Sequence, residues 1–153
     1  MLLYLMRHGE ASHSSPDKPS SLTARGQSDV ARLAEHLVQK KKLRIDAIWH
    51  SPKTRAIQTA EIVWKALENT GLVLEEKKDL SPDGDSEQIH HEILKRKSGN
   101  LLIVSHLPFL PDLSGLLLGG GTQSLTFPTA GIAAFERQGI FNLLWTLDPS
   151  TLK

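Results

Sequence analysis

A run of apolar residues from Leu2 to Met6 stops abruptly at the triplet Arg7-His8-Gly9. The run is too short for a helix of its own, and its continuous apolarity is typical of a buried parallel strand. Ligands of open α/β sheets bind at the carboxyl ends of the strands, so Arg7 and His8 would leave this strand at the ligand-binding edge. Gly9 has no Cβ, which allows a sharp turn and the close approach of an oxyanion to the backbone. Taken alone, a histidine in this position is more often a structural residue than a functional one.

Other short apolar runs alternate with segments whose apolar residues recur at helical spacing. Thr23 is predicted to cap a helix whose apolar stripe extends from Val30 to Val38. Gly26 lowers helix propensity in the first turn, so a packing or site role is predicted there. Ser51 and Pro52 are typical of an N-cap and a first helical position, which predicts a second helix. The remaining predictions are strands at 45–50, 72–74 and 100–105, helices at 86–96 and 111–118, and a hairpin of strands 131–137 and 140–147.

This alternation predicts an α/β fold with three layers, in which a mainly parallel central sheet is flanked by helices and carries an antiparallel edge hairpin. The 153 residues, 39% hydrophobic and 23% charged, fit a single domain covering 1–153. A net charge of +1 gives no electrostatic reason to expect nucleic acid or an anionic membrane as a partner. The basic run Lys40–Lys42 is interpreted as a solvated helix end.

The chain contains no Cys, which excludes disulfides, thiolate nucleophiles and Cys-ligated zinc. No stretch approaches the roughly 18 apolar residues of a membrane span. The apolar run Leu2–Met6 is not preceded by the basic segment of a signal peptide, so a cytoplasmic location is expected.

Three predicted strand ends carry a cationic or imidazole side chain: Arg7-His8, Arg55 just beyond the strand that ends at His50, and His106. If these strands are parallel neighbours, their ends meet at one edge of the sheet. Two arginines and a helix N-terminus suit a phosphoryl group, and no cluster of carboxylates suited to Mg²⁺ accompanies them. The pattern predicts phosphoryl transfer to a nitrogen nucleophile without a metal or another cofactor.

Four motifs lie in order along the chain: Arg7-His8-Gly9-Glu10, Leu22-Thr23-x-x-Gly26, Ser51-Pro52-x-x-Arg55-Ala56-x-Gln58-Thr59-Ala60 and Val104-Ser105-His106. Together they resemble the histidine phosphatase superfamily. The short chain and the sequence Ser105-His106-Leu107-Pro108 are most similar to the SixA-type phosphohistidine phosphatases.

The resemblance implies that His8 is transiently phosphorylated and that Arg7, Arg55 and His106 hold the phosphate. Leu107 keeps its N–H group, so it could add a backbone donor to the substrate-binding set, whereas Pro108 could not. Nearby cations should lower the pKa of His8, which must attack as a neutral imidazole.

Only the 24 residues 61–84 separate Ala60 from Asp85, which leaves no room for the helical cap that many relatives insert there. An open, shallow pocket suits a phosphorylated side chain on another protein better than a small metabolite. Relatives also supply a carboxylic general acid, but no spacing singles one out in this chain. The candidates are Asp83, Asp85, Glu87, Glu10 and Asp17.

The predicted function is therefore the removal of phosphate from phosphohistidine on a partner protein, through a covalent phosphohistidine intermediate. Two alternatives remain open. One is a small-molecule phosphomonoesterase on the same scaffold, and the other is a phosphohistidine-binding module without turnover.

Overall fold

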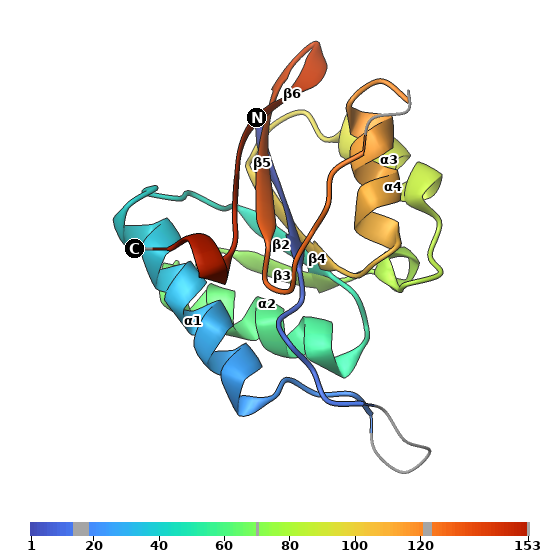
Figure 1. The fold of residues 1–153 in the computed structure, drawn as a ribbon. Helices are drawn as coiled ribbons and strands as arrows, with labels where there is room; N and C mark the ends of the chain where they lie inside the picture. The colour runs from blue at the N-terminus through green and yellow to red at the C-terminus, as the bar shows by residue number, and fades with distance from the viewer. Residues whose placement is uncertain (14–18, 70, 121–123, 153) are drawn as a thin grey trace.

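The computed structural model describes residues 1–13, 19–69, 71–120 and 124–152. Within these ranges a six-stranded sheet forms the middle layer, with the strand order β3-β2-β4-β1-β5-β6 (Figure 1). The first four strands of this order run parallel, β5 is antiparallel to β1, and β6 is antiparallel to β5. The strands are β1 Leu2–Arg7, β2 Ala47–His50, β3 Val73–Glu76, β4 Leu101–Ser105, β5 Ile132–Gln138 and β6 Ile140–Leu147.

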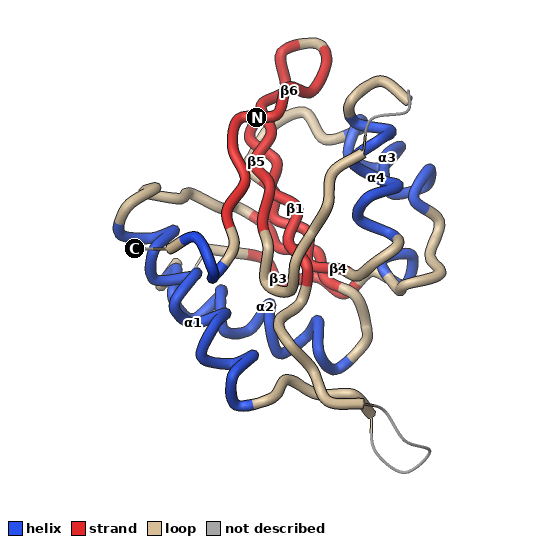
Figure 2. Tube along the Cα trace, viewed as in Figure 1, coloured by secondary structure: helices blue, strands red, loops and turns tan. Residues whose placement is uncertain are grey.

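Helices cover both faces of the sheet, with α1 and α2 on one side and α3 and α4 on the other (Figure 2). Successive residues of a strand point to opposite faces, so along β1 Tyr4 and Met6 pack in the core beneath α1 and α2, while Leu3 and Leu5 pack in the core beneath α3 and α4. Both faces of β1 are therefore buried, which explains its continuous apolar sequence and confirms the three-layer prediction. The helices are α1 Ala24–Gln39, α2 Thr54–Leu67, α3 Ser86–Lys95 and α4 Phe109–Leu117, with short 3₁₀ turns η1 Lys78–Leu80 and η2 Pro149–Thr151.

The prediction for the start of α1 is confirmed, because the side chain of Thr23 accepts a hydrogen bond from the N–H of Gly26 at 2.9 Å. The helix predicted after Ser51 is present as α2, but its predicted start is wrong. This helix begins at Thr54, and its N-cap is Lys53, which makes no side-chain capping bond. The Oγ of Ser51 instead accepts from the Lys53 N–H at 3.1 Å, so Ser51 closes a turn ahead of the helix.

Two other boundaries differ from the predictions for physical reasons. Helix α4 begins at Phe109, before the predicted start at Pro111, because a proline is tolerated within the first turn, where N–H groups have no helical partner. Strand β3 continues through Glu75 and Glu76, and all four of its residues are exposed. As an edge strand it lacks the apolar pattern that would have marked its full length.

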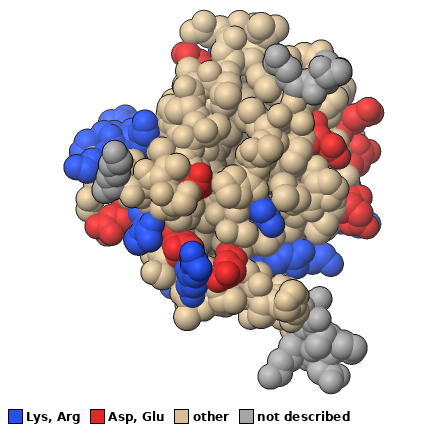
Figure 3. All heavy atoms as spheres, viewed as in Figure 1, with Lys and Arg blue, Asp and Glu red and all other residues tan. Residues whose placement is uncertain are grey.

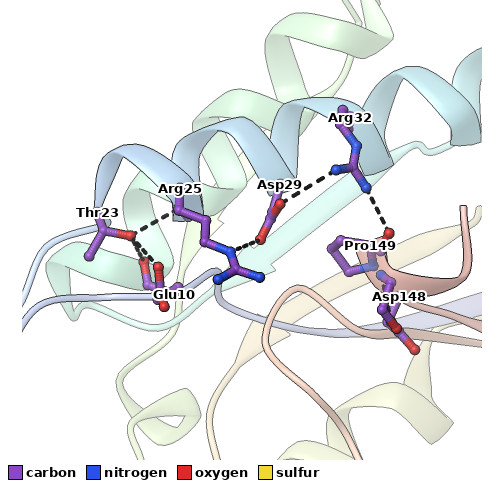
Figure 4. Close-up of polar contacts among 9 residues, drawn as sticks. Glu10, Thr23, Arg25, Asp29, Arg32, Asp148 and Pro149 are labelled. Atoms are coloured by element: carbon purple, nitrogen blue, oxygen red, sulfur yellow. Dashed lines mark hydrogen bonds and ion pairs between the residues drawn. The ribbon is translucent and has the colours of Figure 1, made fainter.

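Charged side chains of both signs lie on the surface, and Lys and Arg gather at the side where α1 ends (Figure 3). Lys40, the C-cap of α1, is exposed together with Lys41 and Lys42, as expected for a solvated helix end. The chain end is tied to α1 by Arg32, which donates to the carbonyl of Pro149 at 2.7 Å (Figure 4). Among the described residues, no helix has the length and apolarity needed to cross a membrane.

We predict that Gly26→Ala destabilises the fold. A Cβ at Gly26 would lie 2.0 Å from the backbone oxygen of Glu10, which cannot rotate away. Overpacking of this kind lowers the free energy of unfolding by about 1–3 kcal/mol, which outweighs the gain of up to about 1 kcal/mol in helix propensity. Urea denaturation measures the change.

Gly71→Ala is the matched control, since a Cβ there would meet the Asn69 side chain at an ordinary 3.5 Å. A Gly26→Ala protein as stable as the wild type would show that α1 and the Glu10 backbone are not held in this contact.

Candidate active site

The candidate site lies at the carboxyl ends of three parallel strands. β4 pairs with β1 on one side, where Arg7 is opposite Ser105, and with β2 on the other, where His50 is opposite Val104. β1 and β2 are not direct neighbours, because β4 lies between them. Since all three strands run in the same direction, their ends still deliver the predicted side chains to one edge of the sheet.

The backbone of His8 is held on both sides of the chain. Its N–H donates to the carbonyl of Ser105 at 3.1 Å, and its own carbonyl accepts from the Ala130 N–H at 3.0 Å. The ring Nδ1 lies 2.7 Å from the carbonyl oxygen of Gly9. A carbonyl only accepts, so Nδ1 carries the proton and the lone pair of the neutral ring is on Nε2. Arg55 donates its Nε–H to this Nε2 at 3.3 Å.

Burial is the largest cause that lowers the pKa of His8, and the charges of Arg55 and Arg7 lower it further, to about 4. The bond to the Gly9 carbonyl acts in the opposite direction. The direction agrees with the sequence prediction, although that prediction named only the cations. At neutral pH the ring is therefore uncharged, and Nε2 keeps an unprotonated lone pair, which accepts from Arg55.

His106 lies beside His8, with 5.0 Å between the ring centroids and 57° between the ring planes. Only 1% of its surface is exposed, and burial, followed by the charges of His8, Arg55, Lys53 and Arg7, lowers its pKa to about 3. Its Nε2 lies 2.7 Å from Ser51 Oγ. Its Nδ1 is buried and has no hydrogen-bond partner among the described residues.

The two arginines approach the histidines from different elements. Arg55 comes from the first turn of α2, and Arg7 is the last residue of β1. One terminal nitrogen of Arg7 donates to the carbonyl of Phe127 at 2.9 Å, and its buried Nε has no partner among the described residues. Burial lowers the pKa of both arginines, yet a guanidinium stays charged at neutral pH. The site thus combines two cations with two neutral imidazoles, an arrangement suited to a phosphoryl group.

A family model described as the histidine phosphatase superfamily (branch 1) matches residues 3–81. The chain belongs to this superfamily. The phosphohistidine phosphatase SixA of Escherichia coli strain K12 is 31% identical over 161 residues, covering 100% of this chain and 97% of that protein. A solved structure of the protein histidine phosphatase SixA complexed with tungstate is 28% identical, with a TM-score of 0.87 and 100% of both chains covered. A phosphoglycerate mutase from Bacillus anthracis has the same fold, with a TM-score of 0.71 at 19% identity over 97% of this chain and 93% of that chain.

These comparisons confirm the resemblance to the superfamily and to its SixA-type members. In the structure, some residues of the four motifs lie at the strand ends and others support them. Thr59 is a supporting residue that sequence reasoning did not single out. Its Oγ1 accepts from the Gly9 N–H at 3.1 Å and donates to the Arg55 carbonyl at 2.8 Å, so it joins the turn after His8 to α2.

Gly9 serves a different purpose from the one predicted. A Cβ there would lie 2.7 Å from the Val30 side chain and 3.0 Å from the carbonyl oxygen of Gly26. The space beside Gly9 is therefore filled by α1 and is not open to an oxyanion. The glycine allows the turn after β1 to pack closely against this helix.

The motif residues around Glu10 also support the turn (Figure 4). The Glu10 carboxylate accepts from Thr23 Oγ1 at 2.8 Å, and its carbonyl accepts from the Thr23 N–H at 3.0 Å. The Leu22 N–H donates to the Gln58 side chain at 2.7 Å, which connects this segment to α2. Gly26 has the packing role predicted for it, since its backbone lies against Glu10.

Two of the candidate acids already have structural partners. Glu10 is engaged by Thr23, and Asp85 is the N-cap of α3, where it accepts from the Gln88 N–H at 3.1 Å. Asp83 and Glu87 are exposed, and Asp17 lies outside the described residues. The turn that carries Asp83 is brought to this edge of the sheet because Ser105 Oγ donates to the Leu80 carbonyl at 2.6 Å.

Leu107, the predicted backbone donor, follows His106 directly and has 39% of its surface exposed. Ser51 and Lys53 were not predicted as neighbours of His106. Only their position in the sequence could have indicated this, because both residues follow the end of β2, at the same edge of the sheet as the predicted residues. Among the described residues, no three His, Asp or Glu side chains form a group that could hold a metal ion.

We predict that the two low-pKa histidines make the protein sensitive to acid. In the unfolded chain His8 binds a proton near pH 6.5, but in the folded protein it does so only near pH 4. Between these values the unfolded state holds more protons, so the free energy of unfolding should fall as the pH falls from about 6.5 to about 4. Urea denaturation at several pH values measures this.

His8→Gln removes one of the two groups and should make the fall over this pH range smaller than in the wild type. The comparison uses only the change of the free energy of unfolding with pH, so an effect of the substitution that is the same at every pH cancels. An equal fall in both proteins would contradict the low pKa of His8.

Proposed function

We propose that the protein is a phosphatase that removes the phosphoryl group from a phosphohistidine side chain of another protein. The observation that carries the proposal is the lone pair of His8 Nε2, which lies on the side of Arg55 and accepts its Nε–H, because Nδ1 is bound to the Gly9 carbonyl. The proposal is supported by the 31% identity to the phosphohistidine phosphatase SixA.

In the first step His8 Nε2 attacks the phosphorus of the substrate. A P–N bond to His8 forms, the P–N bond to the substrate imidazole breaks, and the leaving nitrogen takes up a proton from solvent. Arg7 and Arg55 balance the charge on the phosphoryl oxygens, and their attraction increases as charge spreads over these oxygens in the transition state.

In the second step water attacks phospho-His8. A P–O bond forms, the P–N bond breaks, and inorganic phosphate leaves neutral His8 ready for another cycle. Once His8 Nε2 is bonded to phosphorus, it can no longer accept from Arg55. The Arg55 Nε–H is then free to donate to a phosphoryl oxygen, so the same donor serves both states.

Two features favour a protein-borne phosphohistidine. In the described part of the segment between Ala60 and Asp85, the elements are the end of α2, β3 and η1, with no inserted helical cap. The candidate acids Glu10 and Asp85 are engaged in structural contacts. An imidazole leaves more readily than an alkoxide, so a phosphohistidine depends less on a strong general acid than a phosphoester does.

We predict that His8→Ala abolishes turnover and the phosphoenzyme, since no other group in the proposal supplies the nucleophile. Mass spectrometry at alkaline pH, where phosphohistidine survives, should find the phosphoryl group on His8 of the wild type. His91→Ala is the control, because His91 is exposed on α3. A phosphoryl adduct on His106, or appreciable activity of the His8→Ala protein, would show that the nucleophile is misassigned.

We predict that kcat/KM on a phosphorylated histidine phosphotransfer domain exceeds that on a phosphoserine peptide or 3-phosphoglycerate by at least about 10²-fold. The three substrates are compared side by side with the same enzyme, in the presence of EDTA, since no step of the proposal uses a metal. Equal turnover of either phosphoester would reject the substrate assignment and leave the His8 mechanism in place. Activity that disappears in EDTA and returns with Mg²⁺ or Zn²⁺ would reject the metal-free mechanism.

A further inference from the structure

Ser51 is fully buried at the end of β2 and is fixed by contacts on every side. Its N–H donates to the Val104 carbonyl at 3.1 Å, and its carbonyl oxygen lies 2.9 Å from His50 Nδ1. Its Oγ accepts from the Lys53 N–H at 3.1 Å and lies 2.7 Å from His106 Nε2. The capping role typical of a serine before a helix is therefore replaced by a contact with a histidine of the site.

The contact between Ser51 and His106 requires one proton, and either side could supply it. A serine hydroxyl has one proton to donate, and its oxygen can also accept. The Lys53 N–H already occupies an acceptor position on Oγ. His106 is neutral at pH 7, because its pKa is lowered to about 3, so its ring carries a single proton, on Nε2 or on Nδ1.

If the proton were on Nε2, His106 would donate to Ser51, and the buried Nδ1 would present a bare lone pair. Such a lone pair would repel the oxygens of a phosphoryl group bound between Arg7 and Arg55. The Ser51 hydroxyl proton would also be left without an acceptor among its observed contacts. The unpaired hydroxyl has a cost even without a ligand, because burying a polar group without a hydrogen bond is unfavourable.

If the proton is on Nδ1, the Ser51 hydroxyl donates to His106 Nε2. Each contact then pairs one donor with one acceptor, because the Lys53 N–H donates to Oγ and the hydroxyl donates to the ring. The buried Nδ1–H, which has no partner among the described residues, is then a donor available to a phosphoryl oxygen. We infer that Ser51 is a positioning residue, which holds His106 in the Nδ1–H form so that this ring can donate a hydrogen bond to the transferring phosphoryl group. The inference rests on the proposed function for the identity of that group.

The tautomer can be read directly in the wild-type protein. Long-range ¹H–¹⁵N correlation NMR at pH 7 should show His106 protonated at Nδ1 and unprotonated at Nε2. A proton on Nε2 would overturn the inference. This measurement needs no substrate, so its failure is distinct from a failure of the proposed phosphatase activity.

Substitution tests the consequence. Ser51→Ala should lose the fixed Nδ1–H form and bind inorganic phosphate about 10-fold more weakly, while phospho-His8 still forms. Ser51→Thr, which keeps the hydroxyl, should recover both the tautomer and the affinity. The control is Ser114→Ala, because Ser114 is equally buried and bonded, to the Pro111 carbonyl and the Leu125 N–H, but lies on α4.

Two results with Ser51→Ala would overturn the inference. One is an unchanged His106 tautomer together with unchanged phosphate affinity. The other is a loss of affinity that Ser114→Ala reproduces, since that would indicate a general loosening of the fold. Circular dichroism and urea denaturation of each variant show whether the fold is retained.

Discussion

The parallel pairing of β4 with both β1 and β2 is the constraint on which the site depends. Arg7 lies opposite Ser105, and His50 lies opposite Val104, so the three strands end within one residue of each other. The residue that follows each strand therefore leaves the sheet at the same level. His8 and Ser51 each donate a backbone hydrogen bond to a carbonyl of β4, which continues the pairing one step beyond the strands. The distance between His8 and His106 is thus set by the spacing of β1 and β4 rather than by flexible loops.

This placement has an electrostatic consequence. Desolvation disfavours the charged form of an imidazole, and neighbouring cations disfavour it further, so both buried histidines stay neutral beside two guanidinium groups. The positive charge of the pocket therefore belongs to arginine, which does not titrate near neutral pH, while the histidines supply lone pairs and N–H groups. An oxyanion entering between Arg7 and Arg55 would neutralise charge that is already desolvated, which strengthens its attraction.

Much of this could be predicted from the sequence, because the signals are local. The apolar run Leu2–Met6 marks a strand buried on both faces, and the cap at Thr23 marks the start of α1. His8, Arg55 and His106 could be chosen as site candidates because each follows a predicted strand, Arg55 at a distance of a few residues. Strand order was less accessible, since β1 and β2 are separated by a strand that comes later in the chain. The length of edge strand β3 was underestimated because its residues are exposed and need no apolar pattern.

Contacts between distant segments could not be predicted, and they decide what Ser51, Gly9 and Thr59 do. Ser51 followed by proline has the pattern of a helix cap, but the tertiary contact with His106 outweighs that local preference. Gly9 has the pattern of an anion-binding turn, but α1 fills the space beside it. Thr59 lies on a helix 50 residues from Gly9, and no local pattern reveals that its hydroxyl holds the Gly9 N–H.

In the proposed mechanism these three residues share one physical purpose, which is to fix the orientation of the groups that react. A nucleophile displaced by a fraction of an ångström loses much of the rate gained by positioning, because the reacting atoms must lie near their final geometry. In this chain the turn after β1 is bonded to α2 through Thr59 and packed against α1 through Gly9, so His8 is held by both helices of one layer. The orientation of His8 is therefore fixed by contacts with elements of its own layer, and these contacts need no covering domain.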